Sequence, residues 1–321
     1  MREITFMRAQ NEAINEEMER DPSIFIIGEN VRAFGSEAIF SGLFDKYGGE
    51  RVRDTAISET AILGGAIGAA ATGMRPIASL GFADFMGVCG DELINQLQMR
   101  YMFGGRIKLP LTISANFGAG RSVAAQHSKS LFGWFMAVKG LKIVAPSTAY
   151  DAKGLFKSAI REDNPVIFLA HKLLAGVKSP VPEEEYTIPL GKADIKREGK
   201  DVTVVTAAYM VHEALAAATK LQEKGISLEV IDLRTIVPLD KQAILDSVKK
   251  TGRLVVFVEE PKTAGLAAEI SAIVAEEGFD FLDAPIKRVC APDTPVPFSP
   301  VLEKFWLPGA ESLIKAVTEI T

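Results

Sequence analysis

Glu59 has the position in this sequence that best suits acid–base chemistry. It stands at the head of a predicted helix whose other side chains are very small, in the stretch Ile-Ser-Glu-Thr-Ala-Ile-Leu-Gly-Gly-Ala-Ile-Gly-Ala-Ala-Ala at 57–71. A carboxylate in the first turn is favoured by the helix dipole, and Ser58 is a candidate N-cap. A solvated acid on a packing helix has the same pattern, so this stretch alone allows a catalytic or a structural interpretation.

His127 is the second candidate for catalysis. The chain has three histidines, and His127 is the one that follows a glycine-rich loop (116–122) in a polar setting, Ala-Ala-Gln-His-Ser. His171 and His212 are expected at a strand exit and at a helix start, without an evident acid–base partner near them in the sequence. We therefore single out His127.

Polar and aromatic residues follow two of the predicted strands. Glu29 and Asn30 come directly after the apolar run 24–28, and Phe82 and Phe85 come after the strand 75–80. Open α/β sheets bind their ligands at the carboxyl ends of the strands. Aromatic rings at such an edge can stack on a planar ligand, although buried phenylalanines more often belong to a core.

The helix behind Glu59 has a face with almost no side-chain volume. Gly64, Gly65 and Gly68 recur among alanines at spacings of three and four. Each glycine costs about 1 kcal/mol relative to alanine inside a helix, so three of them indicate a packing or functional reason. Another helix could approach this face closely, and we expect it to form part of a surface between subunits.

The elements that must position these residues alternate along the chain, which predicts an α/β fold with mainly parallel sheets. We expect strands at 24–28, 75–80, 108–115, 141–145, 166–170, 202–207, 227–232, 253–259 and 286–290, and helices at 3–21, 37–47, 59–71, 87–102, 150–161, 211–224, 241–250 and 264–277. Periodicity fades between 176 and 200, so we place two domains at 1–182 and 183–321.

Composition narrows the function further. The chain has 321 residues, is 48% hydrophobic and carries a net charge of −5, which gives no support to nucleic-acid binding. No apolar run is long enough to span a bilayer, and the first twenty residues lack a signal-peptide core, so we expect a soluble, cytoplasmic protein. Cys89 and Cys290 match no metal or redox spacing, and no Rossmann or P-loop glycine pattern occurs.

Over essentially its whole length the sequence resembles the beta subunit of the thiamine diphosphate-dependent component of acetoin and 2-oxo acid dehydrogenase complexes. The resemblance rests on several short ordered segments: 53–55, 57–59, 73–76, 100–105, 124–128, 232–235 and 283–289. It implies a transketolase-like fold, with a pyrimidine-binding domain that contains a parallel sheet and a smaller three-layer αβα C-terminal domain. It also implies an α2β2 heterotetramer with an alpha subunit, bound to a lipoyl acyltransferase core.

The resemblance also assigns roles to residues. Glu59 is the carboxyl group that exchanges a proton with the pyrimidine ring nitrogen of thiamine diphosphate, and Phe85 packs on the face of that ring. Ile57 and Gly81 complete the cofactor-binding residues, and His127 steadies the reacting acyl group and the incoming lipoyl group. Mg²⁺ belongs to the partner chain, because this chain lacks the Gly-Asp-Gly motif. Backbone carbonyls that could hold K⁺ map onto Leu111, Ala159, Ile160, Glu162 and Asn164.

Four small residues depart from the usual pattern of this family. Ser79 and Gly81 stand where a glutamate and a bulky apolar residue are usual, and Ala170 and Ala175 replace a glutamate and a tyrosine. The two alanines could enlarge a nearby cavity. The resemblance favours acetoin or pyruvate as substrate. Alternatives are the C-terminal half of a split transketolase, a branched-chain 2-oxo acid dehydrogenase beta subunit, or a non-catalytic paralogue.

Overall fold

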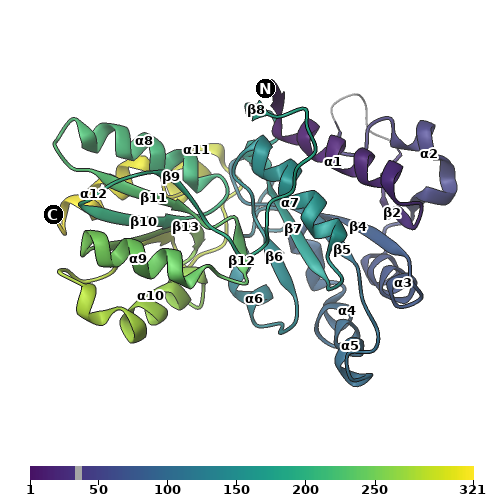
Figure 1. Ribbon diagram of the computed structural model, residues 1–321. Helices are drawn as coiled ribbons and strands as arrows, with labels where there is room; N and C mark the ends of the chain where they lie inside the picture. The colour runs from purple at the N-terminus through teal and green to yellow at the C-terminus, as the bar shows by residue number, and fades with distance from the viewer. Residues whose placement is uncertain (33–37) are drawn as a thin grey trace. The chain divides into compact units, whose positions relative to one another are not determined.

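The computed structural model describes residues 1–32 and 38–321, and the chain forms two compact units (Figure 1). The first unit contains 1–117 and 136–190, and the second contains 118–135 and 191–321. The domain ranges 1–182 and 183–321 stay a prediction. The compact units assign the segment 118–135, which carries His127, to the second unit.

A parallel sheet forms the centre of the first unit, with strand order β6-β7-β5-β4-β2-β3. Its strands are β2 (Ile24–Glu29), β3 (Val52–Thr55), β4 (Arg75–Phe82), β5 (Thr112–Phe117), β6 (Lys142–Val144) and β7 (Val166–His171). All six residues of β7 are buried, as expected for a strand covered on both faces. The carboxyl ends of these strands therefore meet at one edge.

Helices cover both faces of this sheet. They are α1 (Phe6–Arg20), α2 (Leu43–Arg51), α3 (Glu59–Ala71), α4 (Gly90–Ile94), α5 (Met99–Met102) and α7 (Ala149–Arg161), and Figure 1 shows α1 and α7 on the face opposite α3. Half-buried ion pairs connect α1 and α7, and one of them joins Lys153 Nζ and Glu16 Oε1 at 2.6 Å. Arg161 Nη2 lies 2.6 Å from Glu17 Oε1 in the same interface.

Three predicted helices differ from the structure. The helix expected at 3–21 begins at Phe6, because β1 (Arg2–Thr5) pairs antiparallel with β8 (Lys178–Val181). The helix expected at 87–102 is broken into α4, a 3₁₀ turn (Gln96–Gln98) and α5. The helix expected at 37–47 begins only at Leu43, and its first predicted residue lies outside the described residues.

The second unit is a three-layer αβα structure. Its sheet has the order β14-β13-β10-β11-β9, parallel except for β9. The elements are α6 (Phe132–Met136), β9 (Asp194–Arg197), β10 (Val202–Thr206), α8 (Met210–Gln222), β11 (Leu228–Asp232), β12 (Thr235–Val237), α9 (Lys241–Thr251), β13 (Leu254–Pro261), α10 (Leu266–Glu277), β14 (Lys287–Ala291), α11 (Pro300–Trp306) and α12 (Ala310–Thr318). Helices α8 and α12 cover one face, and α9 and α10 cover the other (Figure 1).

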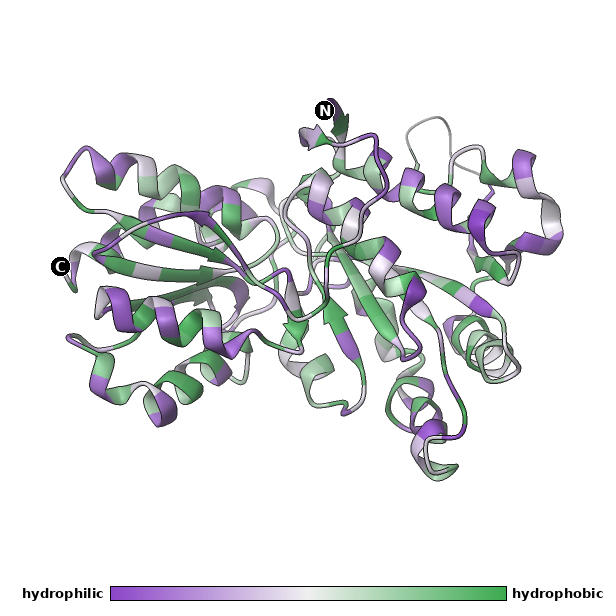
Figure 2. Cartoon of the chain, in the orientation of Figure 1, coloured by the Kyte–Doolittle hydropathy of each residue, from purple (hydrophilic) through white to green (hydrophobic). Residues whose placement is uncertain are grey.

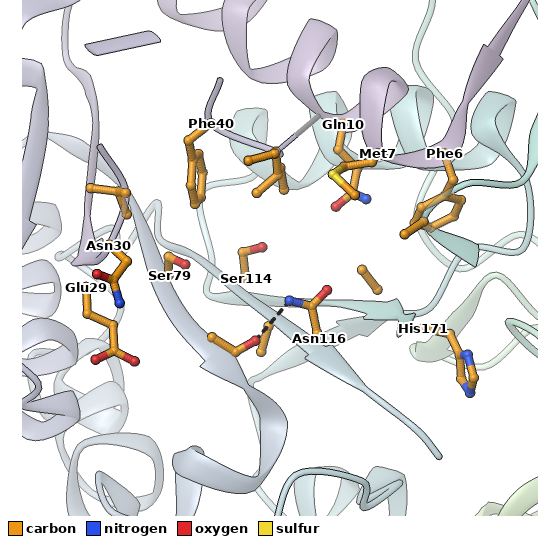
Figure 3. Close-up of a pocket in the computed structure, with 17 residues that line it drawn as sticks. Phe6, Met7, Gln10, Glu29, Asn30, Phe40, Ser79, Ser114, Asn116 and His171 are labelled. Atoms are coloured by element: carbon orange, nitrogen blue, oxygen red, sulfur yellow. Dashed lines mark hydrogen bonds between the residues drawn. The ribbon is translucent and has the colours of Figure 1, made fainter. Parts of the chain in front are cut away.

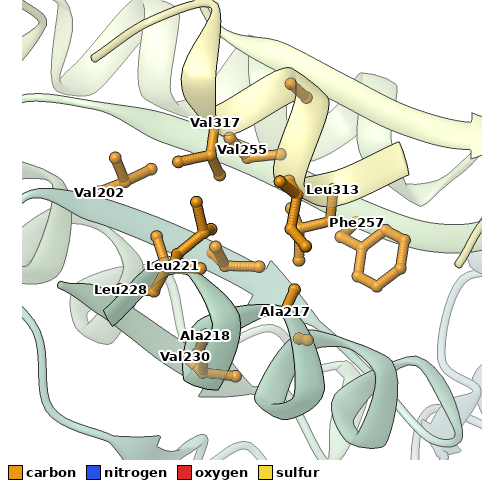
Figure 4. Packing of buried hydrophobic residues seen from close by; sticks show 14 of the residues in the cluster. Val202, Ala217, Ala218, Leu221, Leu228, Val230, Val255, Phe257, Leu313 and Val317 are labelled. Carbon is orange, nitrogen blue, oxygen red and sulfur yellow. The ribbon is translucent and has the colours of Figure 1, made fainter. Parts of the chain in front are cut away.

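Aliphatic side chains from both layers fill the core between this sheet and the α8–α12 face. Figure 4 shows Leu221 of α8 and Val317 of α12 packed against strand residues such as Val202 and Val255. Figure 2 shows hydrophobic residues concentrated on the strands and hydrophilic residues on the outer sides of the helices. This pattern produced the α/β prediction, which the structure confirms.

Several short elements were not predicted: β1, β3, β8, β9, β12, α6, α11 and α12. None of the helices in the described part of the chain combines the length and apolar character needed to cross a membrane.

Candidate functional site

A cavity of about 600 Å³ opens in the first unit, at the carboxyl ends of β2, β4, β5 and β7 (Figure 3). Helix α1 forms its other side. Its polar lining residues come from both sides: Gln10, Glu29, Asn30, Ser79, Ser114, Asn116 and His171. Larger apolar side chains, among them Phe6, Met7 and Phe40, complete the wall. Ser79, Gly81, Ala170 and Ala175, the four small departures, all line this cavity.

Gly81 marks the place where the cavity comes close to Phe85. Its φ of +67° is a left-handed backbone conformation that favours glycine. A Cβ atom on Gly81 would lie 3.7 Å from Glu29 Oε1 and 4.0 Å from ring carbons of Phe85. Asn116 Nδ2 donates a hydrogen bond of 3.1 Å to the carbonyl oxygen of Gly81. The carbonyl group of Gly81 is thus held by a side chain of β5, and a side chain at position 81 would contact the ring of Phe85.

Phe85 lies in a 3₁₀ turn (Ala83–Gly87) directly after β4. Its ring meets the ring of Phe82 edge to face, with centroids 5.6 Å apart. Lys172 Nζ lies 5.3 Å from the centroid of the Phe82 ring. An aromatic ring held in this way can present a face to a planar ligand.

Glu59 is the first residue of α3 and is only 9% exposed. Among the described residues its carboxyl group has no hydrogen-bond or ion-pair partner. Ser58 occupies the N-cap position, but its side chain makes no capping hydrogen bond, so the prediction that it caps the helix is wrong in that respect. Ile57 is 78% exposed. Neither Glu59 nor Ile57 is among the residues that line the cavity.

His127 belongs to the second unit, whereas Glu59 belongs to the first. Its backbone N–H donates to the carbonyl oxygen of Ala124 at 3.4 Å. Ser122 and Ala124, which precede it, both have left-handed φ values, 54° and 60°. The loop before His127 is thus held in an uncommon backbone conformation.

Three buried carboxylates of the second unit hold this segment. Glu259 accepts hydrogen bonds from the N–H of Ala119 and the hydroxyl of Ser130, at 2.7 Å and 3.2 Å. Glu303 accepts from the N–H of Gly120 and of Ser122, both at 2.8 Å. These bonds fix both ends of the stretch that carries His127. We call Glu259, Glu260 and Glu303 the carboxylate clamp.

Glu260 is the third member of the carboxylate clamp. It is 4% exposed and accepts from the N–H of Gly133 at 2.6 Å and of Leu266 at 2.7 Å. Burial raises the pKa of Glu260 to about 7, although both backbone hydrogen bonds favour the charged form. Sequence reasoning missed the clamp. The signal that could have revealed it is the pair Glu259-Glu260 at the end of an apolar strand. Charged residues in such a buried position need partners.

The residues suggested for K⁺ lie where α7 leads into β7, with Leu111 alongside. The carbonyl oxygen of Leu111 accepts from the N–H of Val166 at 2.9 Å. Arg75 Nη1 donates to the carbonyl oxygens of Ile160 and Glu162, at 3.1 Å and 3.2 Å. Ala159 accepts from the N–H of Glu162, and Asn164 Nδ2 donates to Glu162 Oε1. Clustered carbonyl oxygens suit a hard cation, and here a guanidinium already meets two of them.

Comparisons with known proteins agree over the whole chain. Residues 2–178 match the family "Transketolase, pyrimidine binding domain", and residues 191–313 match "Transketolase, C-terminal domain". The chain is 49% identical to the acetoin:2,6-dichlorophenolindophenol oxidoreductase subunit beta of Cupriavidus necator, covering 98% of this chain and 96% of that protein. The Bacillus subtilis protein of the same name is 47% identical, over 99% and 97% of the two chains.

Two further proteins are similar to this chain. The 2-oxoisovalerate dehydrogenase subunit beta of Bacillus subtilis is 43% identical, over 99% of this chain and 98% of that protein. A solved structure described as a split gene transketolase, inactive beta4 tetramer, superposes with a TM-score of 0.81 over 99% of this chain and 98% of the other. Its sequence identity is 24%, so it supports the fold alone.

Proposed function

Because the chain belongs to the transketolase-like family of beta subunits of thiamine diphosphate-dependent dehydrogenases, we propose that it is the beta subunit of an acetoin or pyruvate dehydrogenase. The enzyme cleaves the carbon–carbon bond beside the substrate carbonyl and transfers the two-carbon fragment to a lipoyl carrier. The observation that carries the proposal is the carboxyl group of Glu59, nearly buried at the start of α3 without a hydrogen-bond partner among the described residues.

The residues present fit the pyrimidine half of the cofactor. Gly81 leaves space beside the ring of Phe85, and Phe85 offers an aromatic face to a planar heterocycle. Glu59 and Ile57 would belong to the residues that hold the pyrimidine ring, and the carboxyl group of Glu59 would be the one that exchanges a proton with it. When bound, thiamine diphosphate supplies a nucleophilic carbon for attack on the substrate carbonyl. A carboxyl group suits this activation, because a group that both donates and accepts a proton can shift the pyrimidine ring between its two protonation states.

His127 donates a hydrogen bond to the reacting oxygen and to the incoming lipoyl group. The carboxylate clamp positions it, because the three acids bind the backbone on both sides of the loop. A catalytic group held by buried hydrogen bonds loses little entropy when the reaction begins.

The partner is an alpha subunit, in an α2β2 heterotetramer that docks on a lipoyl acyltransferase core in the cytoplasm. The described residues contain no group of three His, Cys, Asp or Glu side chains that could hold a metal ion. In this proposal the alpha subunit binds Mg²⁺ and the diphosphate. Potassium bound by the carbonyls of Leu111, Ala159, Ile160, Glu162 and Asn164 would have a structural role. It would share the carbonyl oxygens of Ile160 and Glu162 with Arg75, since each carbonyl oxygen has two lone pairs.

The substrate is tested on the reconstituted α2β2 enzyme. We expect kcat/KM for acetoin or pyruvate to exceed that for 2-oxoisovalerate, measured with an artificial electron acceptor. A pocket that gains or loses one methylene discriminates by only about 1–3 kcal/mol, so some activity on all three is expected. A clear preference for 2-oxoisovalerate would transfer the chain to the branched-chain class and leave the role of Glu59 unchanged.

The alpha subunit is tested with this chain alone. Because half of the cofactor site lies on the partner, the purified chain should show no tight binding of thiamine diphosphate by calorimetry and no turnover. Micromolar affinity of the isolated chain would contradict the shared site.

A further inference from the structure

The second unit has a pocket of its own, with a volume of about 340 Å³, between β14 and α12. β14 is the edge strand of its sheet and pairs only with β13. The polar residues that line the pocket are Lys262, Lys287, Arg288, Ser312, Lys315 and Glu319. All of them belong to the second unit, and none is among the residues proposed for the cofactor or the reaction.

This pocket gathers positive charge. Four of its lining side chains are cationic and one is acidic, so its net charge is +3, whereas the whole chain carries −5. The cations come from three separate segments: the loop after β13, the start of β14 and the last turn of α12. Like charges gathered in one concave site create a local positive potential, which attracts anions.

Only one of the four cations has an acidic partner. Lys287 Nζ lies 2.8 Å from Glu319 Oε2, and Glu319 is the one acid that lines the pocket. Within the described chain, no carboxylate lies at ion-pair distance from Lys262, Arg288 or Lys315. Three positive charges therefore face the pocket without a counter-ion from these residues.

Arg288 and Lys262 are held beside each other. Arg288 is half-buried, and its Nη1 atom donates a hydrogen bond of 3.0 Å to the carbonyl oxygen of Lys262. The nearby acid Asp293 is bound by a neutral group instead, since Thr263 donates to both of its oxygens, at 3.0 Å and 2.7 Å. The other guanidinium N–H groups can donate in parallel to phosphate oxygens, and Ser312 adds an exposed hydroxyl donor.

We propose that this pocket binds the phosphate group of a small soluble molecule. The phosphate accepts hydrogen bonds from Arg288, and Lys262 and Lys315 balance its charge. A phosphate monoester carries nearly two negative charges at pH 7, so it offsets more of the excess than a carboxylate does. Only Ile286 and Ala316 are apolar among the lining residues, so the pocket offers little surface to an acyl chain. The site goes beyond the proposed function.

Three compounds with the same three-carbon body test this chemistry on the purified full-length chain. Glycerol 3-phosphate carries the phosphate, glycerate carries a carboxylate, and glycerol carries no charge. By calorimetry or ligand-observed NMR at low ionic strength, glycerol 3-phosphate should bind at least about five times more tightly than glycerate, the ratio expected for one further ion pair. Glycerol should not bind in that range, and inorganic phosphate should compete. Equal affinities for the three compounds, or no binding of glycerol 3-phosphate, would overturn the proposal.

Two variants assign the binding to named residues. Arg288→Gln should weaken the binding of glycerol 3-phosphate about tenfold, because it removes a charge-assisted hydrogen bond. Lys315→Gln, at an exposed position of α12, should weaken it about two- to fivefold. The matched control Lys224→Gln removes the same charge from an exposed position after α8, and it should leave the affinity unchanged.

The variants also separate a pocket from a general attraction. If Arg288→Gln lowers the melting temperature, the double variant Lys262→Gln/Lys315→Gln replaces it, because both lysines are exposed. Wild-type affinity in the pocket variants would contradict the assignment. An equal loss in Lys224→Gln would contradict it too, since the anion would then respond only to the net charge of the chain.

A lipid headgroup presents the same phosphate chemistry, so a separate measurement distinguishes this source. The chain should sediment no better with phosphatidylcholine vesicles that contain phosphatidic acid than with phosphatidylcholine vesicles alone. If the chain sediments with the acidic vesicles and does not bind glycerol 3-phosphate, the pocket serves a membrane surface and the proposal of a soluble ligand is wrong.

Discussion

Glu259 accepts a hydrogen bond of 2.7 Å from the backbone N–H of Ala119, although 140 residues separate the two in the sequence. Ser130 donates to the same carboxylate oxygen at 3.2 Å. One buried acid thus holds the two ends of the stretch that contains His127. The position of this histidine depends on β13, which carries the acid, as much as on its own loop.

Loss of the Glu259 carboxylate should destabilise the chain and lower turnover together. Glu259→Ala leaves the N–H of Ala119 and the hydroxyl of Ser130 without an acceptor, which costs about 1–3 kcal/mol per buried group. Urea unfolding should show this loss, and kcat of the reconstituted enzyme should fall. Glu223→Ala, at an exposed position after α8, serves as the control. If Glu259→Ala loses stability but keeps the full kcat, the clamp does not position His127.

Glu260 should make stability depend on pH between about 4.5 and 7. Because burial raises its pKa in the folded chain to about 7, the folded state binds a proton in this range that the unfolded chain has released. Its contribution to stability is therefore complete below pH 4.5 and is lost as pH rises toward 7, by at most about 3 kcal/mol. Melting temperatures of wild type and Glu260→Gln across this range test the effect. Identical pH profiles of the two proteins would contradict it.

Glu59→Gln should stop activation of the cofactor while the complex still assembles. Glutamine keeps the shape of the side chain but cannot exchange a proton with the ring nitrogen. Hydrogen–deuterium exchange at the thiazolium carbon in the assembled enzyme should slow by at least the roughly 10²–10⁴-fold typical of a lost acid–base group. Glu311→Gln, an exposed acid in the first turn of α12, should leave the exchange rate unchanged. Near-normal exchange in Glu59→Gln would remove Glu59 from the mechanism.

Gly65→Leu should weaken subunit assembly without harming the fold of the chain. Helix α3 buries Ile62, Leu63 and Ile67, while Gly65 is exposed, and a Cβ atom on Gly65 would meet nothing within 4 Å. A leucine there overpacks an interface by about 1–3 kcal/mol if another subunit approaches this face. Sedimentation velocity with the alpha subunit measures the loss, against Ala216→Leu as control. Unchanged sedimentation would leave this face without a partner.

The sequence was most informative where structure is local. The apolar run 166–170 predicted β7 within one residue, because a strand covered on both faces must be continuously apolar. The strand expected at 108–115 is β5 at Thr112–Phe117, so its predicted start was four residues too early. The break of the helix expected at 87–102 escaped prediction, since its apolar spacing continues across the 3₁₀ turn at Gln96–Gln98. The pair β1–β8 escaped as well, because each strand is only four residues long and their partners are far apart in sequence.

In the candidate site, too, the features with local sequence signals could be predicted and those that depend on distant contacts could not. Glu59, Phe85 and Gly81 could be selected from one stretch each, since a helix start, a strand exit and a bend all have sequence signals. The cavity could not be predicted, because it lies between α1 and four strands. Its volume depends on four small residues that are far apart in the sequence: Ser79, Gly81, Ala170 and Ala175. The carboxylate clamp depends on pairs more than a hundred residues apart.

The placement of 118–135 in the second unit has a practical consequence for dividing the protein. The polypeptide passes from one unit to the other three times, after 117, 135 and 190, so no single cut of the gene separates them. A fragment expressed from residue 191 would contain Glu259, Glu260 and Glu303 without the amide groups of Ala119, Gly120 and Gly133. These three buried carboxyl groups would then lack backbone donors that they have in the whole chain, so such a fragment should be insoluble unless a peptide covering 118–135 is supplied in trans.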